Sequence, residues 1–395
     1  MDPKSVTKDD LYGTLDATTR EWRDGLFTHL LRKIVDNVRG EGSKRHWIIF
    51  DGDVDPEWVE NLNSVLDDNR LLTLPNGERL ALPPNVRIMF EVETLRYATL
   101  ATVSRCGMVW FSDDTVSFSM AMQRYLRVLQ TEPLGDAEES VFKAEAAGAA
   151  AKDGEASLSP AMRVQAMAAT ILEPYFAPDG LVERALAFSQ DLEHIMDFTR
   201  ARVLSTLSTL MNKAVLQVVE YNSQHSDFPL GADVVESFLT KRLVVALVWS
   251  FSGDAPLRAR TVMSEFVRRA TTIDLPPLSG VAGDEAVIDY DVALRSGSAE
   301  WVSWASRVPH VEIEAHHVLQ SGLVVPTTDT LRHEDVLMAW LAEHRPLLLC
   351  GPPGSGKTMT LLAALRSLTD LDVAALNFSS ATTPELVLKA LEQHC

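Results

Sequence analysis

Gly351-Pro-Pro-Gly-Ser-Gly-Lys357-Thr358 fits the pattern GxxxxGK[ST], in which glycines precede a lysine and a hydroxyl side chain. The apolar run Pro346–Cys350 comes before this stretch, and Met359–Leu368, which has helical character, follows it. The motif therefore lies between an expected strand and an expected helix, which is the context of a P-loop. The glycines let the backbone curl so that successive N–H groups point into one phosphate-sized concavity, and the helix adds the positive end of its dipole.

The side chains of the motif have separate expected roles. Lys357 is expected to reach the β- and γ-phosphates as a point charge, and the Thr358 hydroxyl is expected to ligate Mg²⁺. The cofactors implied are ATP or ADP together with Mg²⁺. The backbone that is expected to hold the phosphates belongs to Gly351, Pro352, Pro353, Gly354, Ser355 and Gly356. The alternative is a glycine-rich strand-to-helix turn that binds no ligand.

Val325 and Pro326 precede the P-loop by a distance typical of a segment that covers the adenine. This signal is weak, because any apolar segment could pack there.

A P-loop also needs an acidic residue at the end of a neighbouring strand, normally downstream in the chain. The residues after Thr358 contain no apolar strand that ends in Asp or Glu. Trp47–Phe50, near the other end of the chain, is such a strand, and it ends in Asp51. The simplest interpretation is that the chain holds the back of one nucleotide module and the front of the next.

Composition limits the classes of partner and compartment. The formal net charge of −19 argues against nucleic acid or an anionic membrane as the main partner. The three cysteines, Cys106, Cys350 and Cys395, are too few and too scattered for a disulfide framework or a zinc site, which fits a reducing cytosol. No uninterrupted apolar run approaches the roughly 18 residues of a membrane span.

Four segments are expected from the pattern. Residues 1–115 alternate between helices and strands, as in a doubly wound α/β domain that lacks its first strand and P-loop. Residues 116–272 are strongly helical, apart from 134–158, which reads as an exposed, mobile loop because it has almost no large apolar residues. Residues 273–300 read as an extended linker, and 301–395 as the start of the next α/β module.

Several individual elements are expected within these segments. The helices expected are Leu26–Val38, a helix capped by Asp55, Leu95–Val103, Val234–Ser250, Arg258–Thr271 and His333–Ala342. The strands expected are Trp47–Phe50, Val86–Val92, Met108–Phe111 as a last buried strand, Pro346–Cys350 and Val373–Phe378. Leu71–Leu74 and Glu78–Leu82, joined through Pro75-Asn76-Gly77, predict a β-hairpin.

Asp51 is the candidate Mg²⁺-facing carboxylate of the first module, with a turn-capping role as its alternative. ATPases of this type usually place Glu directly after that Asp, where it polarises the attacking water. Here the next residue is Gly52, which polarises nothing, and Asp53 would point the same way as Asp51 if the backbone stays strand-like. The first site is therefore predicted to bind nucleotide and to hydrolyse it poorly or not at all.

Arg105, in Ser104-Arg105-Cys106-Gly107, is a candidate arginine finger that reaches the γ-phosphate of a neighbouring module. An internal salt bridge is the alternative. Glu91 and Glu93 end the strand where a polar residue that senses the bound nucleotide, such as Asn, is expected. The sensor of the first site is therefore expected to be altered. Arg258 and Arg260 are candidate phosphate sensors, for which a solvated helix face is the simpler interpretation.

Several stretches together resemble the cytoplasmic dynein heavy chains. They are Leu11-Tyr-Gly-Thr-Leu-Asp16 with Glu21-Trp-Arg-Asp-Gly-Leu26, the stretch from Ile49 to Asp68, Ala101-Thr-Val-Ser-Arg-Cys-Gly107, and Leu349–Thr358 with Asn377–Glu385. The resemblance covers nearly the whole chain except 134–158. It implies AAA+ modules of the P-loop NTPase class, each with a parallel sheet flanked by helices, and a helical small domain between two partial large domains. On this resemblance the chain is a fragment that runs from the second module, entered after its P-loop, to the start of the third.

The resemblance also implies a function and partners. The whole protein would be a six-module ring that moves toward microtubule minus ends in the cytoplasm, with a coiled-coil stalk. The second module would bind ATP without turnover, Arg105 would face the first, main hydrolytic module, and the third would regulate the motor. The implied partners are the neighbouring AAA+ modules of the same heavy chain, microtubules, dynein intermediate and light chains, dynactin, the lissencephaly-linked regulator and a second heavy chain in a homodimer. The isolated chain is not expected to hydrolyse ATP.

Two other functions fit the same sequence. One is a nucleotide-binding scaffold in which both sites are structural. The other is a tandem AAA+ ring that remodels assemblies, like the very large ring ATPases of ribosome assembly.

Overall fold

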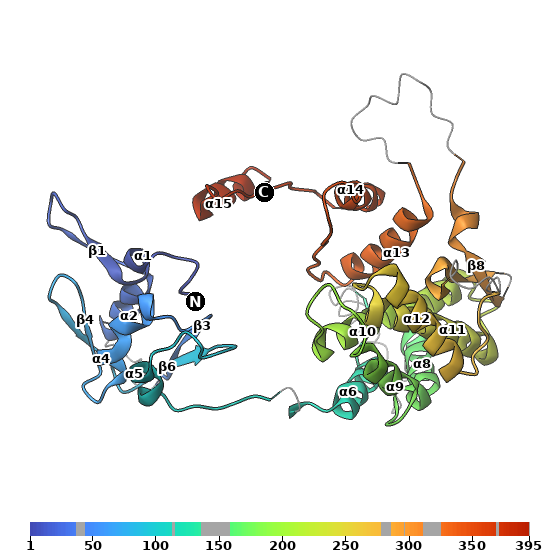
Figure 1. Ribbon diagram of the computed structural model, residues 1–395, viewed down its shortest axis with the longest axis horizontal. Coiled ribbons are helices and arrows are strands. Elements are labelled where there is room, and N and C mark those ends of the chain that lie inside the picture. Colours follow the sequence, from blue (N-terminus) through green and yellow to red (C-terminus); the bar gives the residue numbers. More distant parts are fainter. Residues whose placement is uncertain are drawn as a thin grey trace, which may run out of the picture. The chain divides into compact units, whose positions relative to one another are not determined.

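The computed structural model describes residues 1–36, 44–112, 115–135, 159–277, 286–295, 297–310, 325–368 and 371–394. Their contacts divide the chain into two compact units, Met1–Asp113 and Asp114–Cys395 (Figure 1). Each unit has its own cluster of buried hydrophobic side chains. No helix among these residues is both long and apolar enough to cross a membrane.

The first unit is a small α/β unit built around one parallel strand pair. Strands β3 (His46–Asp51) and β6 (Val86–Glu91) pair in parallel, with Asp51 opposite Glu91. The helical elements are α1 (Lys8–Tyr12), α2 (Leu26–Asp36), α3 (Pro56–Val59), the 3-10 turn η1 (Glu60–Leu62), α4 (Asn63–Leu66) and α5 (Leu100–Arg105). The remaining strands are β1 (Gly13–Leu15), β2 (Trp22–Asp24), β4 (Leu71–Thr73) and β5 (Arg79–Ala81).

The core of the first unit is aromatic. Phe50 of β3 stacks on Phe90 of β6 at 5.6 Å between ring centroids and also contacts Phe27 of α2 and Trp58 of α3. Asp55 caps α3 by accepting a hydrogen bond from the Glu57 N–H at 2.8 Å, as expected for an Asp-Pro start. The buried Tyr12 hydroxyl donates to the Trp58 carbonyl at 2.7 Å, and the Trp58 indole N–H donates to the Asp53 carbonyl at 3.2 Å, so both polar groups have partners.

Two hairpins are joined by one arginine. The Asn-Gly hairpin β4–β5 forms as predicted, and Gly77 at its turn has φ +88°. The hairpin β1–β2 is a finding that the sequence pattern did not predict. Arg32 of α2 binds Asp24 of β2 at 2.8 Å and Glu78 beside β5 at 2.8 Å, and these bonds hold the pKa of both carboxyls below their usual range.

The prediction of a last buried strand at Met108–Phe111 is wrong. This run is extended but pairs with no described strand, and its four side chains are 61–79% exposed. Among the described residues, β6 pairs only with β3, so no strand of this sheet lies beside residues 108–111. An apolar run indicates that a strand can be buried, but pairing needs a second strand in register.

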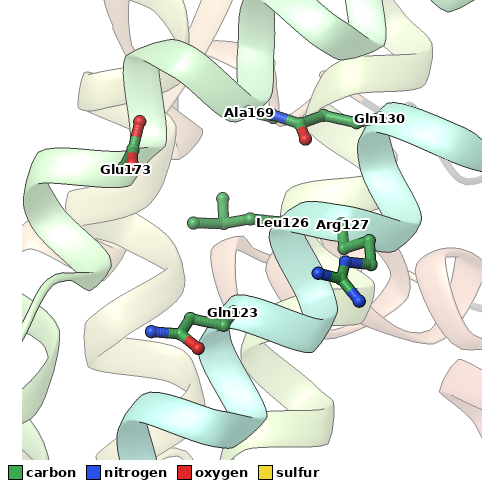
Figure 2. Close-up of a pocket in the computed structure, with 6 residues that line it drawn as sticks. All are labelled: Gln123, Leu126, Arg127, Gln130, Ala169 and Glu173. Carbon is green, nitrogen blue, oxygen red and sulfur yellow. The ribbon is translucent and has the colours of Figure 1, made fainter.

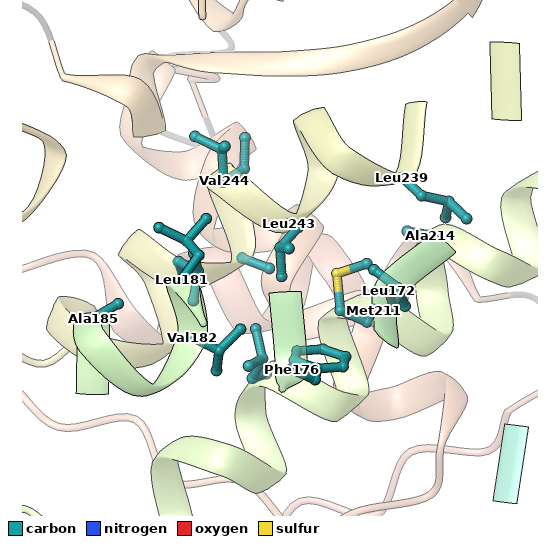
Figure 3. Close-up of a cluster of buried hydrophobic side chains, with 14 of the residues drawn as sticks. Leu172, Phe176, Leu181, Val182, Ala185, Met211, Ala214, Leu239, Leu243 and Val244 are labelled. Atoms are coloured by element: carbon teal, nitrogen blue, oxygen red, sulfur yellow. The ribbon is translucent and has the colours of Figure 1, made fainter. Parts of the chain in front are cut away.

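The second unit begins with a helical bundle. Its helices are α6 (Phe118–Thr131), α8 (Pro160–Phe176), α9 (Leu181–Ser189), α10 (Arg200–Gln224), α11 (Ala232–Ser252) and α12 (Leu257–Ala270). Helix α11 is buried along most of its length, because it packs against α8, α9, α10 and α12. Figure 3 shows side chains of α8, α9, α10 and α11 converging in this core, among them Phe176, Val182, Met211 and Leu243. The expected mobile loop at 134–158 lies almost entirely outside the described residues.

The prediction of an extended linker at 273–300 is wrong for its second half. The 3-10 turn η3 (Val287–Asp289) leads into an antiparallel hairpin of β7 (Tyr290–Arg295) and β8 (Ser298–Ser303), followed by the 3-10 turn η4 (Trp304–Arg307). Gly297, between the two strands, has φ +74° and makes the hairpin turn. The hairpin packs on α11, so it belongs to the helical bundle.

A buried carboxylate fastens the hairpin to the bundle. Asp291 of β7 is 3% exposed and pairs with Arg242 of α11 and, at 2.6 Å, with Arg307 of η4. Arg242 also donates to the Gln217 side chain of α10 at 2.7 Å. A buried ion of this kind is tolerated only when its partners are in place, so the contact fixes the hairpin in one position.

The last part of the second unit holds three helices. They are α13 (Thr328–Ala342), α14 (Lys357–Ser367) and α15 (Pro384–Glu392). The predicted helix His333–Ala342 is confirmed within α13, which Thr327 caps. The predicted strands Pro346–Cys350 and Val373–Phe378 are wrong, because both segments are extended without strand pairing among the described residues.

Replacing Asp291 by Ala should destabilise the second unit by about 3–5 kcal/mol, since the change leaves Arg242 and Arg307 without their shared buried partner. The matched control is Asp274→Ala, because Asp274 also pairs with an α11 cation, Lys241, but is 73% exposed. That change should cost at most about 1 kcal/mol. Urea unfolding followed by far-UV circular dichroism measures both, and equal losses in the two variants would contradict the role given to Asp291.

Candidate functional site

The P-loop backbone adopts the curl that its glycines predict. Gly354 and Gly356 have φ +80° and +82°, in the left-handed region that glycine adopts without a steric penalty. A Cβ on Gly351 would lie 3.1 Å from Ser355 Oγ and 3.6 Å from Lys357 Cδ, so a side chain there would crowd the loop. Helix α14 begins at Lys357, directly after this curl. The residues present therefore fit a phosphate group.

Lys357 lies against the loop that it follows. Its ammonium donates to the carbonyls of Gly351 and Pro352 at 2.8 and 2.7 Å and to Ser355 Oγ at 3.2 Å. These bonds put a positive charge beside the curled backbone at the positive end of the α14 dipole. Thr358, in the first turn of α14, is exposed, so its hydroxyl is accessible to a hydrated metal ion.

The predicted adenine-covering segment lies just before α13. Val325 is half exposed and Pro326 less so, and Thr327 then caps the helix. Helix α13 packs against α14, which connects this segment to the P-loop helix. The positions of Val325 and Pro326 relative to a bound adenine stay a prediction.

Asp51 lies at the carboxyl end of β3, as predicted, and its side chain is exposed. The strand ends there because Gly52 has φ +138°, a conformation that L side chains rarely adopt. The Gly52 N–H donates to the Glu91 carbonyl at 3.1 Å, which fixes this turn at the end of the sheet. A Cβ at position 52 would lie 3.1 Å from Asp2 Oδ1, so a glutamate there would be strained by the backbone conformation and crowded by the Asp2 side chain.

Asp53 is held by Lys4. The Lys4 ammonium lies 3.2 Å from Asp53 and 3.9 Å from Asp55, and 5.7 Å from the centroid of the Tyr97 ring. The backbone at Gly52 is not strand-like, so the condition under which Asp53 would point the same way as Asp51 is not met. Asp53 is engaged in this ion pair and does not replace the missing Glu.

Arg105 is the last residue of α5 and is partly exposed. Its Nε donates to Asp67 Oδ1 at 2.5 Å, and its Nη1 donates to the Ala101 carbonyl at 2.7 Å. The internal salt bridge, which was the alternative to an arginine finger, is therefore present. It does not bury the guanidinium, so the finger role stays a prediction.

The other predicted arginines have structural partners. Arg258 is exposed and pairs with Glu193 on the surface, as a solvated helix face predicts. Arg260 donates to the carbonyls of Gly253 and Ala255 at 2.6 and 3.1 Å, at the end of α11, and lies over the Trp249 ring. Burial, aided by the charge of Arg332, lowers the pKa of Arg260.

The predicted site residues lie in two different units. Asp51 and Arg105 belong to the first unit, and the P-loop belongs to the second. No cluster of three or more metal-binding side chains occurs among the described residues, so the two Mg²⁺ positions remain predictions that need the phosphates as ligands.

A pocket of about 240 Å³ lies elsewhere in the second unit, between α6 and α8. Figure 2 shows Leu126 of α6 directed into it, with Gln123, Arg127 and Gln130 on the same helix and Glu173 on α8. None of the predicted site residues lines this pocket. It is part of the bundle surface rather than of the P-loop.

The sequence pattern did not predict the polar contacts that join α10 to α13, the helix that precedes the P-loop. Glu343, directly after α13, binds Thr209 and Asn212 of α10, and Lys213 of α10 binds Asp335 of α13. The available signal was that Ser205, Thr209 and Asn212 recur at helical spacing along α10.

Three family models match consecutive parts of the chain. Residues 1–106 match an AAA domain of the dynein-related subfamily, 172–306 match the dynein heavy chain AAA lid domain, and 313–395 match the P-loop containing dynein motor region. The lid match ends at 306, so it includes the hairpin that was predicted to be a linker. The other two matches assign the segments before and after this lid to an AAA domain and to a P-loop containing motor region.

Relatives that match this chain over its whole length agree with these family models. The chain is 57% identical to a cytoplasmic dynein heavy chain of Drosophila melanogaster, 56% identical to one of Neurospora crassa and 52% identical to one of Caenorhabditis elegans, in each case over 100% of the chain. It spans only 8–9% of the length of these relatives. The chain belongs to the dynein heavy-chain family.

Proposed function

We propose that this chain is part of the ATP-driven motor ring of a cytoplasmic dynein heavy chain, a minus-end-directed microtubule motor. The observation that carries the proposal is the curled loop Gly351–Gly356 with the Lys357 ammonium at its edge. The whole length of this chain matches a part of dynein heavy chains. In this proposal residues 1–115 are the back of the second AAA+ module, the helical segment is its small domain, and the last segment is the front of the third module.

The P-loop is proposed as a regulatory ATP site. Lys357 would exchange its loop carbonyls for phosphate oxygens, and the exposed Thr358 hydroxyl would take one position on Mg²⁺, which neutralises the charge that develops on the phosphates. The backbone N–H groups of the loop need no rearrangement for this, because both left-handed glycines already hold the curl.

The first module is proposed to bind ATP and to hydrolyse it poorly or not at all. Asp51 would hold Mg²⁺ through water at the end of β3. Beside it, Gly52 supplies no base, and the Asp53 carboxylate is paired with Lys4. Neither of the two residues that follow Asp51 in the chain is then available to polarise an attacking water.

Arg105 is proposed to act on the neighbouring main hydrolytic module as an arginine finger. Asp67 would hold the Arg105 guanidinium near the surface through Nε, and a change of the Arg105 side-chain rotamer would then bring the guanidinium to the neighbouring module. The implied partners of the whole protein are the neighbouring AAA+ modules, microtubules, the intermediate and light chains, dynactin, the lissencephaly-linked regulator and a second heavy chain.

A non-hydrolytic scaffold is the second candidate function, and the geometry at Gly52 favours it for the first site. A remodelling ring is the third. A long coiled coil after the fourth module of the longer protein favours the motor, and an adaptor-binding tail without such a stalk favours the remodeller.

Replacing Lys357 by Ala removes the ammonium that the P-loop offers to phosphate. In the full-length motor, with the main ATPase module intact, we expect microtubule gliding to slow severalfold, because losing this charge-assisted contact weakens phosphate binding at one site only. Gliding velocity measures the effect, and Lys389→Ala, on α15, is the matched control. An unchanged velocity would mean that nucleotide binding at this P-loop does not regulate movement.

Replacing Gly52 by Glu supplies the acid that ATPases of this type carry, but in a backbone that disfavours it. We expect no gain in ATP turnover and a loss of stability of about 1–3 kcal/mol, since φ is +138° and Asp2 is close. Gly77→Ala, also at positive φ but with open space around its Cβ, separates backbone strain from crowding. A rise in turnover after Gly52→Glu would show that the missing side chain alone silences the site.

A further inference from the structure

Helix α13 is fastened to α10 by a row of polar contacts, which we call the polar seam. The α10 side chains of the seam are Ser205, Thr209, Asn212 and Lys213, and their partners are Asp335, Glu343 and Arg345. The α10 residues follow helical spacing and so share one face of that helix. The contacts run in antiparallel order, from Lys213 with Asp335 to Ser205 with Arg345, which is the pattern of one continuous interface.

Glu343 is the centre of the polar seam. One carboxylate oxygen accepts from Asn212 Nδ2 at 2.7 Å, and the other accepts from Thr209 Oγ1 at 2.7 Å and forms an ion pair with Arg345 Nε at 2.9 Å. Thr209 is fully buried, so its hydroxyl has no access to water if Glu343 is lost. Charge-assisted bonds of this kind are stronger than neutral ones and fix direction as well as distance.

The seam extends into the bundle core. Tyr125 of α6 donates its hydroxyl to Asn212 Oδ1 at 3.0 Å, so Asn212 bridges Tyr125 and Glu343. Burial raises the pKa of Tyr125, and the nearby negative charge of Glu343 raises it further. The Glu343 carboxylate is therefore linked to α10 directly and to α6 through Asn212.

The chain reverses sharply after Glu343. His344 has φ +51°, a left-handed conformation that is usually taken by glycine at the end of a helix, and the Arg345 N–H donates back to the Trp340 carbonyl at 3.1 Å. Arg345 then donates to Ser205 Oγ at 2.5 Å. A non-glycine residue persists in this conformation where its surroundings fix it, and here the surroundings are the seam.

Only the segment 346–350 separates this turn from the P-loop. The polar seam holds the amino-terminal end of this segment at Arg345, and α14, which follows the P-loop, packs on α13. We propose that Glu343 is a positioning residue for the P-loop, because its bonds to Thr209 and Asn212 fix the direction in which the chain enters Gly351. The inference rests on the proposed function that this loop binds nucleotide.

The test is hydrogen–deuterium exchange of the full-length protein, read on the peptide that contains residues 346–358 and titrated with ATPγS and Mg²⁺. We expect Glu343→Gln to raise the nucleotide concentration for half-protection roughly tenfold, since a neutral amide cannot accept from all three donors. Exchange of α11 should stay unchanged, which shows that the bundle is folded. Glu334→Gln is the matched control, because the structure gives Glu334, on the same helix, no hydrogen bond or ion pair with the described residues.

A reciprocal exchange separates positioning from general stability. Asn212→Asp alone should raise the half-protection concentration as Glu343→Gln does, since it sets two carboxylates against each other from the α10 side. The double variant Asn212→Asp with Glu343→Gln restores one donor, one acceptor and one charge across the contact, so it should bring protection back most of the way.

The two ways of failing are distinct. If the unmodified protein and Lys357→Ala both lack nucleotide protection of 346–358, the proposed nucleotide site fails, and the inference fails with it. If the unmodified protein is protected, Lys357→Ala is not, and Glu343→Gln matches the unmodified protein, nucleotide binding stands and the positioning role of Glu343 is overturned.

Discussion

A carboxylate out of water is stable only while its cationic and hydrogen-bonding partners stay in place, and the second unit depends on that constraint. Asp291, between Arg242 and Arg307, fixes the hairpin β7–β8 on the helical bundle. Glu343, bound by Thr209 and Asn212, fixes the end of α13 on the same bundle. Apolar packing alone would allow these segments to slide, because it has no direction. The ionic contacts remove that freedom, so the segment that carries the P-loop is aligned with the bundle by direction as well as by burial.

The sequence was sufficient where the determinants are local. The GxxxxGK[ST] spacing predicted the curl at Gly354 and Gly356, the Asn-Gly pair predicted the hairpin β4–β5, and Asp55 before Pro56 predicted a helix cap. It was insufficient where a strand needs a distant partner. Met108–Phe111, Pro346–Cys350 and Val373–Phe378 are apolar enough for buried strands, but none pairs within the described chain. The wrong linker prediction has a related cause, because the strands on either side of Gly297 become strands only by pairing with each other.

The site divides in the same way. Lys357 and Thr358 could be assigned from the motif, since their partners lie within a few residues. Glu343 could not, because Thr209 and Asn212 lie more than 130 residues away and none of these residue types is unusual in its position. Arg105 falls between these cases. Its exposure was expected at a module edge, but its bond to Asp67 depends on the turn after α4, which periodicity does not predict.

The two nucleotide sites of the proposed ring differ in what a single substitution can change. At the P-loop the chemistry rests on a flexible ammonium and a positioned backbone, so the site can be strengthened or weakened by the contacts that hold α13. At Asp51 the limit is the backbone itself, because Gly52 takes a conformation that the Glu91 carbonyl and the neighbouring Asp2 both favour for glycine. Where a side chain limits hydrolysis, one substitution can change the rate. Where backbone geometry limits it, the conformation at the end of the strand must change as well. In the proposed ring, the first site would therefore keep a constant, binding-only role, and the P-loop would be the site open to regulation.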